Sequence, residues 1–256
     1  PLFFYVLVFI NKKSKTTYRK KPYKKNLFIY GTLFGFGFYI SGTHWISNSL
    51  TFDDNFKFLI PFSLILIPLF LSLFISIVTL FLGPFLSFNF SSILILSLGL
   101  AISDYIRSKI LTGFPWNLWS YSFSWATELI QIINKIGLFS FNLITLTIFM
   151  LPVLFLFKYN FGKKILHFSI VPIILFVFYV YGNYSLNHNQ KLINSIDNKF
   201  YIKVISPNFE LKYNLSEEES LNRIKKLIRY SNIDKDRKTL FVWPEGALSG
   251  KYFFEF

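Results

Sequence analysis

Long apolar runs, separated by short polar or basic segments, fill most of the chain. No charged residue occurs from Phe58 to Ser103, a length sufficient for two membrane crossings at about 20 residues each. The Gly83-Pro84 pair and the polar residues 87–89 mark a turn between these crossings. The pattern predicts a polytopic α-helical membrane bundle of about six spans, the first of them truncated, at residues 1–10, 27–50, 58–83, 91–108, 136–157 and 165–182.

The C-terminal segment, residues 183–256, has a different pattern. Residues 199–206 and 239–243 have the composition of short strands, and residues 216–232 have the periodicity of an amphipathic helix. Ser216 and Glu219 fit a capping box at the start of that helix. Because a strand, a helix and a strand with short connections form a right-handed unit, we predict that the two strands pair in parallel.

The composition agrees with a membrane bundle followed by a smaller α/β region. Of the 256 residues, 53% are hydrophobic, more than the roughly 45–50% of a soluble domain. We predict a transmembrane helical bundle at residues 1–182 and the start of an α/β domain at residues 183–256. Because the chain opens with Pro1 inside an apolar run, we expect it to lack its N-terminus. It contains no cysteine, which excludes a disulfide or a thiol nucleophile within these residues.

The formal net charge of +14 is concentrated in two short stretches. Residues 11–26 contain eight Lys or Arg, residues 158–164 contain three, and neither stretch contains an acid. Short basic loops between apolar spans are typical of the cytoplasmic side of a membrane. The pattern therefore predicts that residues 51–57 and the segment after residue 182 face the opposite, extracytoplasmic side. Without a recognition motif, the charge does not indicate a nucleic acid partner.

Isolated polar residues in the spans indicate structural roles. Asp104 and Arg107, three residues apart near the end of a predicted span, are expected to form an ion pair, although charges inside a membrane also invite a functional hypothesis. The histidines His44, His167 and His188 lack the spacing of metal ligands. We therefore predict no metal site and no cofactor.

The stretch TLFVWPEGALSG, residues 239–250, places the carboxylate of Glu245 directly after a predicted strand. Ligands of parallel sheets collect beyond the carboxyl ends of the strands. In one interpretation, Trp243 packs, Pro244 ends the strand and Glu245 is solvated. In the other, Pro244 holds Glu245 against an apolar wall, where it can act as a general base.

A second stretch, TGFPWNLWSYSFSW at residues 112–125, is rich in aromatic residues. It can be interpreted as a belt of interfacial anchors, because Trp and Tyr favour the membrane–water interface. Gly113 and Pro115 favour the alternative, a folded re-entrant segment. The predicted topology puts this stretch on the same side of the membrane as Glu245.

These motifs, in this order, resemble the apolipoprotein N-acyltransferase family. They are GTHWISNS at residues 42–49, TGFPWNLWSYS at 112–122, IKVISPNFELKYN at 202–214 and LFVWPEGALSG at 240–250. The resemblance covers nearly the whole chain and is most specific at TGFPW and WPE. It implies a multi-pass enzyme of the bacterial inner membrane, with a periplasmic catalytic domain of the α-β-β-α, nitrilase-like fold.

The resemblance also implies a reaction and its residues. Members of the family move an acyl chain from a phospholipid to a cysteine, as a thioester, and then to the N-terminal amine of a diacylglyceryl-cysteine apolipoprotein. Glu245 matches the general base of the Trp-Pro-Glu motif. The catalytic Lys and Cys are expected beyond Phe256, so this chain by itself is expected to be inactive. The residues implied in the lipid groove are Gly113, Phe114, Pro115, Trp116, Tyr213 and Trp243.

The chain departs from the family pattern at three positions. Gly246 and Ser249 stand where the family commonly has Thr and Pro. Tyr213 stands where the family commonly has Trp, and a Tyr ring can still form the wall of a lipid cleft.

Two other functions fit part of the pattern. A membrane-tethered nitrilase-type amidase would act on a small amide and would have no use for a phospholipid acyl donor. A transporter or membrane scaffold with an outward binding domain would need no catalytic residue. The predicted spans lack the paired broken helices of transporters, although Pro61 and Pro68 leave this open.

Overall fold

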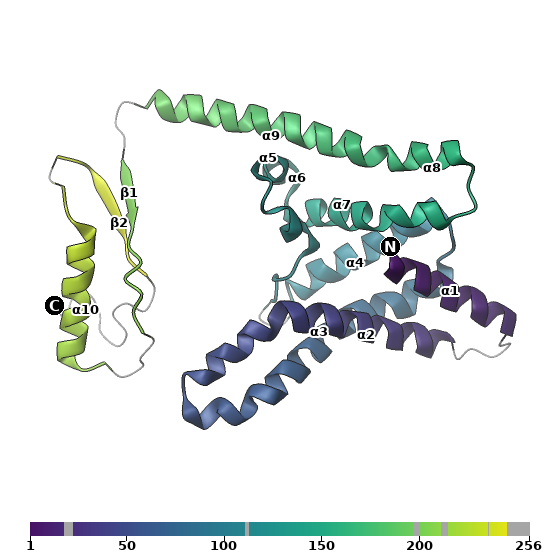
Figure 1. The fold of residues 1–256 in the computed structure, drawn as a ribbon, viewed down its shortest axis with the longest axis horizontal. Coiled ribbons are helices and arrows are strands. Elements are labelled where there is room, and N and C mark those ends of the chain that lie inside the picture. The colour runs from purple at the N-terminus through teal and green to yellow at the C-terminus, as the bar shows by residue number, and fades with distance from the viewer. Residues whose placement is uncertain (18–22, 111–112, 197–199, 211–214, 235, 245–256) are drawn as a thin grey trace. The chain divides into compact units, whose positions relative to one another are not determined.

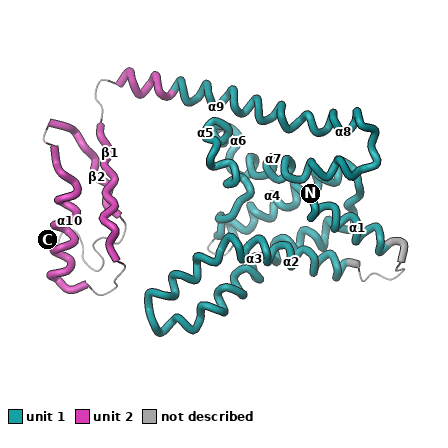
Figure 2. Tube along the Cα trace, viewed as in Figure 1, with its two compact units in different colours: residues 1–188 teal, residues 189–256 magenta. Residues whose placement is uncertain are grey.

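The computed structural model describes residues 1–17, 23–110, 113–196, 200–210, 215–234 and 236–244 (Figure 1). The chain divides into two compact units, residues 1–188 and residues 189–256 (Figure 2). The described part of the first unit is helical. The second unit combines the end of a long helix with a further helix and a small sheet.

The first unit is built from helices joined by short 3₁₀ segments. The longer helices are α1 (Leu2–Thr17), α2 (Tyr23–Thr43), α3 (Ile60–Leu82), α4 (Phe90–Arg107), α7 (Leu138–Met150) and α9 (Ile170–Asn194). The shorter elements are η1 (His44–Thr51), η2 (Asp54–Leu59), η3 (Gly83–Phe85), η4 (Trp119–Phe123), α5 (Thr127–Ile130), α6 (Ile133–Ile136), η5 (Leu151–Leu156) and α8 (Phe161–Phe168).

Four helical stretches among the described residues are long and apolar enough to cross a membrane. They are Asp54–Phe85, Phe90–Arg107, Leu138–Leu156 and Phe161–Asn194. They correspond to the last four predicted spans, and the final helix continues to Asn194 rather than ending at residue 182. The predicted turn between α3 and α4 is confirmed, because η3 occupies residues 83–85 and the Asn89 side chain caps α4 by accepting from Ser92 N at 2.7 Å.

The first two predicted spans are not among these four stretches. Helix α1 has 16 residues and carries Lys12 and Lys13 in its second half. Helix α2 has 21 residues, and its glycines and hydroxyl side chains lower its mean hydropathy. At 1.5 Å per residue α2 is still about 31 Å long, which equals the hydrocarbon thickness of a bilayer.

The described parts of both basic stretches include a residue that contacts the α3–α4 turn, at one end of the first unit. Asn11 donates from Nδ2 to the carbonyl oxygens of Pro84 and Leu86, at 3.0 and 2.8 Å. The Tyr159 hydroxyl accepts a hydrogen bond from Phe90 N at 3.3 Å. We call this end the basic end. Helices α2 and α4 finish at the opposite end of the unit, where α7 begins.

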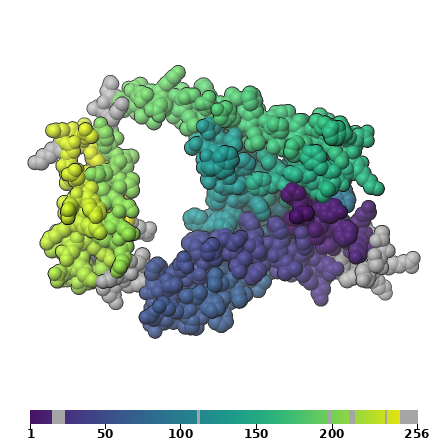
Figure 3. All heavy atoms as spheres, in the orientation of Figure 1, coloured from purple at the N-terminus to yellow at the C-terminus, as the bar shows by residue number. Residues whose placement is uncertain are grey.

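Helices α2 and α3 form an antiparallel hairpin (Figure 1), and the atoms of these two segments adjoin one another in the space-filling view (Figure 3). Small residues allow this approach: a Cβ on Gly35 would lie 2.9 Å from Ser72 Cα. Polar side chains then join the two helices, since the Thr32 and Ser76 hydroxyls lie 2.8 Å apart and Thr79 Oγ1 donates to Leu27 O at 2.9 Å. Small and hydroxyl residues are the usual means of joining helices in a membrane.

The second unit contains β1 (Tyr201–Val204), α10 (Glu217–Ser231) and β2 (Thr239–Val242). The strands pair in parallel with Ile202 opposite Leu240, which confirms the predicted parallel pair. The capping box of Ser216 and Glu219 is also confirmed. Ile205 and Leu227 form the buried core of this unit, and Trp243 packs against them. A two-stranded sheet does not by itself establish a nitrilase-like domain.

The hairpin packing makes a prediction about two glycines on one helix. Gly35→Ala places a Cβ against the α3 backbone at Ser72, whereas the Cβ of Gly37→Ala meets no atom within 4 Å. We expect Gly35→Ala to lower the free energy of unfolding by about 1–3 kcal/mol through overpacking. Gly37→Ala should be neutral or stabilising by up to about 1 kcal/mol, because Ala favours helix more than Gly.

Reversible unfolding of the chain in detergent micelles measures both changes. Equal effects of the two substitutions would contradict the close approach of α2 and α3 at Gly35.

Candidate functional site

The segment that follows α4 folds back onto the end of that helix. Gly113 N donates to Ile110 O at 3.0 Å, and Phe114 N donates to Arg107 O at 3.1 Å. Gly113 has φ +78°, and a Cβ at this position would lie 2.6 Å from Ser108 O. Glycine is therefore required here for two independent reasons, the left-handed backbone and the close approach. We call residues 113–118 the folded loop.

Arg107 holds the folded loop by its backbone. Its Nη1 donates to the carbonyl oxygens of Phe114 and Trp116, at 2.7 and 2.8 Å. Its Nη2 donates to Asp104 Oδ1 at 3.0 Å, which confirms the predicted ion pair. The Arg107 side chain is only 1% exposed, and its guanidinium lies 5.3 Å from the centre of the Tyr39 ring.

Asp104 extends this network to α7. Asn142 donates from Nδ2 to Asp104 Oδ2 at 2.9 Å, and its Oδ1 accepts from Ser120 N at 3.1 Å. The carboxylate therefore has a partner at each oxygen, and the amide of Asn142 has a partner at each end. Since buried charges are stable only when paired and hydrogen-bonded, this network explains how a carboxylate and a guanidinium persist inside an apolar bundle.

The end of α2 covers the other side of the loop. The rings of Phe38 and Trp119 stack at 4.4 Å between their centres. A Cβ on Gly42 would collide with the side chain of Asn117. Thus the motif GTHWISNS, which begins at Gly42, and the motif TGFPWNLW lie in contact, although about 70 residues separate them along the chain.

The four predicted groove residues in this loop differ in exposure. Gly113 and Phe114 are half-buried and line a groove of about 340 Å³ together with Phe70, Phe74 and Arg107. Pro115 and Trp116 are exposed, with Trp116 at 55%. The loop is therefore folded, as Gly113 and Pro115 indicated, and it also presents an aromatic side chain at the surface.

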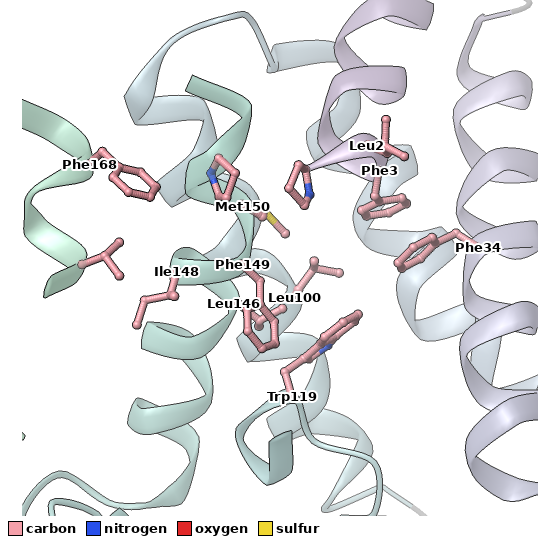
Figure 4. Close-up of a pocket in the computed structure, with 13 residues that line it drawn as sticks. Leu2, Phe3, Phe34, Leu100, Trp119, Leu146, Ile148, Phe149, Met150 and Phe168 are labelled. Atoms are coloured by element: carbon pink, nitrogen blue, oxygen red, sulfur yellow. The ribbon is translucent and has the colours of Figure 1, made fainter. Parts of the chain in front are cut away.

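A larger apolar cavity of about 780 Å³ is lined in part by Trp119 (Figure 4). Its wall combines side chains of α1, α2, α4, α7 and α8, and Figure 4 shows Phe34, Trp119 and Phe168 on different sides of it. Apolar pockets of about 300–1,000 Å³ are the size of small-molecule sites in proteins. Trp119 therefore links the folded loop to an apolar space inside the bundle.

The remaining predicted site residues belong to the second unit. Trp243 follows β2, is half-buried and donates from Nε1 to Ser231 Oγ at 3.1 Å. Glu245 and Tyr213 lie outside the described residues. Among the residues that the structure describes, no group of three His, Cys, Asp or Glu side chains could hold a metal ion.

Two residues of the loop network have contacts that the sequence pattern does not predict. The sequence predicts an ion pair for Arg107 and leaves a functional role open, but it does not predict the hydrogen bonds to two backbone carbonyls. Asn142 was not identified, although a lone amide in the apolar helix α7 was a signal that could have been followed. Polar residues within spans usually face a partner in the bundle.

Comparison with known proteins accounts for most of the chain. Residues 2–151 match the family model described as the apolipoprotein N-acyltransferase N-terminal domain. Proteins named apolipoprotein N-acyltransferase from Rickettsia typhi and Rickettsia bellii are each 32% identical, over 222 and 225 residues. These alignments cover 86% and 87% of this chain and 43% of each relative.

A relative with lower sequence identity has the same name. The protein from Brucella suis named apolipoprotein N-acyltransferase is 27% identical over 228 residues, which cover 85% of this chain and 41% of the relative. The chain thus spans less than half the length of these relatives. Since the family model matches more than half of this chain, the chain belongs to the apolipoprotein N-acyltransferase N-terminal domain family.

Proposed function

We propose that this chain supplies the membrane bundle and the start of the catalytic domain of a lipoprotein N-acyltransferase. The observation that carries the proposal is the family match over residues 2–151, together with relatives of the same name that align on into the second unit. The proposed acyl donor is a phospholipid. The proposed acceptor is the N-terminal amine of a diacylglyceryl-modified apolipoprotein.

The proposed reaction has two steps. A cysteine thiol attacks an ester carbonyl of the phospholipid, releasing a lysophospholipid and leaving a thioester; the acceptor amine then attacks the thioester and regenerates the thiol. Glu245 is the proposed base that takes the thiol proton. In a protein as long as the relatives, the cysteine and an oxyanion-stabilising lysine would come from residues that this chain does not contain.

The second unit has two features that support its place in a larger α-β-β-α domain. Ile202, Val204, Leu240 and Val242 are all exposed and leave one face of the small sheet apolar. Such a face needs a covering layer, as in a domain of stacked layers. Trp243 follows the end of β2, and Glu245 comes two residues later in the sequence; its proposed place is therefore the region beyond the strand ends, where ligands of parallel sheets collect.

The folded loop is the proposed route of the acyl donor. The groove beside Gly113 and Phe114 is walled by apolar side chains of α3, which suits an acyl chain. Trp116, two residues after Phe114, is exposed and can contact the lipid. Pro115 is the fourth proposed groove residue of this loop, with Tyr213 and Trp243 proposed from the second unit.

The proposed location is the bacterial inner membrane, with the basic end in the cytoplasm and the folded loop and second unit on the periplasmic side. The support is the charge distribution: Lys12 and Lys13 follow Asn11 at the basic end, and Lys158 precedes Tyr159 there. Excess Lys and Arg mark the cytoplasmic loops of membrane proteins.

Reporter fusions test this orientation. Alkaline phosphatase is active only in the periplasm, so a fusion after Ser195 should be active and a fusion after Lys20 inactive, because the basic loop stays inside. A cytoplasmic reporter fused at the same two positions should give the opposite result. An active phosphatase at Lys20 together with an inactive one at Ser195 would contradict the proposed topology.

Acyl transfer can be measured in a chimera in which this chain replaces the aligned part of the Rickettsia typhi relative. In that chimera, Trp116→Ala should slow transfer from a labelled phospholipid by about 10-fold or more, since misplacing a bound substrate is costly. Trp125→Ala is the matched control, because Trp125 belongs to the same aromatic stretch and is 77% exposed. Equal rates in the two variants would contradict the proposed lipid route and favour the alternative interpretation, in which the aromatic residues are interfacial anchors.

Glu245→Gln in the same chimera tests the proposed base. Without the carboxylate the thiol stays largely protonated near neutral pH, so thioester formation should fall by about 10²–10⁴-fold. Mass spectrometry of the protein after incubation with phospholipid detects the added acyl chain. Glu218→Gln, an exposed position on α10, is the control. Thioester formation at the unsubstituted rate in Glu245→Gln would exclude Glu245 as the base.

A further inference from the structure

The folded loop depends on a network of three buried side chains that the proposed reaction does not explain. Arg107, Asp104 and Asn142 are 1%, 6% and 0% exposed. Asp104 and Asn142 are enclosed by other side chains, and Arg107 only borders the groove beside Gly113 and Phe114. Yet two of the three carry charge, which is costly within an apolar bundle and unnecessary for packing alone. Their contacts indicate what the network does.

Arg107 determines the shape of the loop through two carbonyl groups. Phe114 O and Trp116 O, two residues apart, both accept from the single Nη1 of Arg107. Gly113, with φ +78°, precedes this pair, and Asn117, with φ +58°, follows it. The two carbonyls therefore lie between two residues with left-handed backbone, and both accept from one nitrogen. The position of Trp116 is therefore fixed by Arg107.

Asp104 and Asn142 determine the orientation of Arg107. Asp104 accepts from Arg107 at one oxygen and from Asn142 at the other, at 3.0 and 2.9 Å. Asn142 in turn accepts from Ser120 N, two residues after the end of the folded loop. The network thus binds the folded loop through Arg107 of α4, and the start of η4 just after the loop through Asn142 of α7.

We infer that Asp104, Arg107 and Asn142 are positioning residues for acyl transfer, holding residues 113–120 in the conformation that receives the acyl donor. The expected effect on acyl transfer rests on the proposed function. The hold of the three side chains on the loop, which we call the clamp, rests on the geometry of the network alone. A purely electrostatic role would require only that the charge of Asp104 be neutralised. The two roles differ in what they require at position 107.

Lysine at position 107 separates the two roles. It preserves the positive charge and can still pair with Asp104, but its single nitrogen replaces two nitrogens in a planar fork. It cannot hold the Phe114 and Trp116 carbonyls while pairing with Asp104 in the same geometry. Arg107→Lys should therefore leave insertion and abundance unchanged while releasing the loop.

An exchange of the acid and the amide provides a rescue. Asp104→Asn alone leaves Arg107 without a counter-charge, and Asn142→Asp alone sets two carboxylates against each other. The double variant, Asp104→Asn with Asn142→Asp, retains one negative charge and can form every hydrogen bond again. The amide now at position 104 would accept from Arg107 and donate to the carboxylate now at position 142, whose other oxygen would accept from Ser120 N.

Loop mobility is measured on the chain itself. Because the chain has no cysteine, Ser122→Cys provides a unique site for a spin label, at an exposed position in η4 just beyond the loop. In lipid nanodiscs we expect the label to become more mobile in Arg107→Lys and in each single exchange variant. It should return to its original mobility in the double variant. Arg229→Lys, exposed on α10, is the matched control and should change nothing.

Acyl transfer is then measured with the same variants in the chimera. Arg107→Lys and the two single variants should slow transfer by about 10²-fold, the cost of misplacing a substrate by about 1 Å, and the double variant should recover most of the loss. If Arg107→Lys does not accumulate in membranes, the comparison of the double exchange variant with the two single ones tests the inference instead. A double variant no better than the single ones, or an immobile label together with unchanged transfer in Arg107→Lys, would overturn the inference.

The two measurements also separate this inference from the proposed function. A chimera that shows no transfer from phospholipid before any substitution contradicts the proposed function, whereas label mobility still reports on the clamp. Transfer that is present in the chimera and unaffected by release of the loop contradicts the positioning role alone.

Discussion

A guanidinium buried in an apolar helical bundle is the constraint on which the rest of the first unit depends. Inside a bilayer, polar groups have no water to bind, so donors and acceptors must find their partners in the protein. Arg107 meets this requirement at its two terminal nitrogens, with one carboxylate and two backbone carbonyls. Removing one partner of a buried ion pair typically costs about 3–5 kcal/mol, so the arrangement resists change. The loop conformation follows from this requirement.

The α2–α3 hairpin meets the same constraint with neutral groups. Ser76 Oγ donates to Ser72 O at 2.8 Å, so that its hydroxyl is satisfied within the helix as well as across to Thr32. Gly35 brings the two backbones close enough for such contacts. The hairpin reaches the end of the unit where the folded loop lies, so the packing of α2 places Gly42 against Asn117 and Phe38 against Trp119. Packing in the middle of the bundle thereby supports the geometry at its end.

The second unit uses cations in a different way, on a solvent-exposed helix. Arg223 donates to Glu210 O at 2.6 Å and lies 4.9 Å from the centre of the Phe209 ring. Lys226 donates to Pro207 O at 3.0 Å. Both side chains fasten the segment after β1 to α10. In each unit, then, a basic side chain on a helix orders an adjacent irregular segment by binding its carbonyl groups.

How much the sequence determined depends on the range of the interactions involved. The charge-free run from Phe58 to Ser103, the Gly83-Pro84 turn, the capping box at Ser216 and the parallel strand pair all follow from local pattern, and the structure agrees with them. The family also followed from short motifs, because TGFPW and WPE are specific at their positions. The exact end of α9 did not follow, since nothing in the residues after 182 stops a helix before Asn194.

Tertiary structure decided the contacts between residues that are far apart in the sequence. Asn142 binds Asp104 across 38 positions, and Gly42 faces Asn117, and no local pattern records either contact. The sequence marked Arg107 as a charge in need of a partner, but a single charge is compatible with many partners. Only the folding of the loop brought Phe114 O and Trp116 O to the same nitrogen. The apolar pattern thus determined the helices and short motifs indicated the family, whereas the geometry of the candidate site arose from long-range hydrogen bonds that exist only once the bundle has packed.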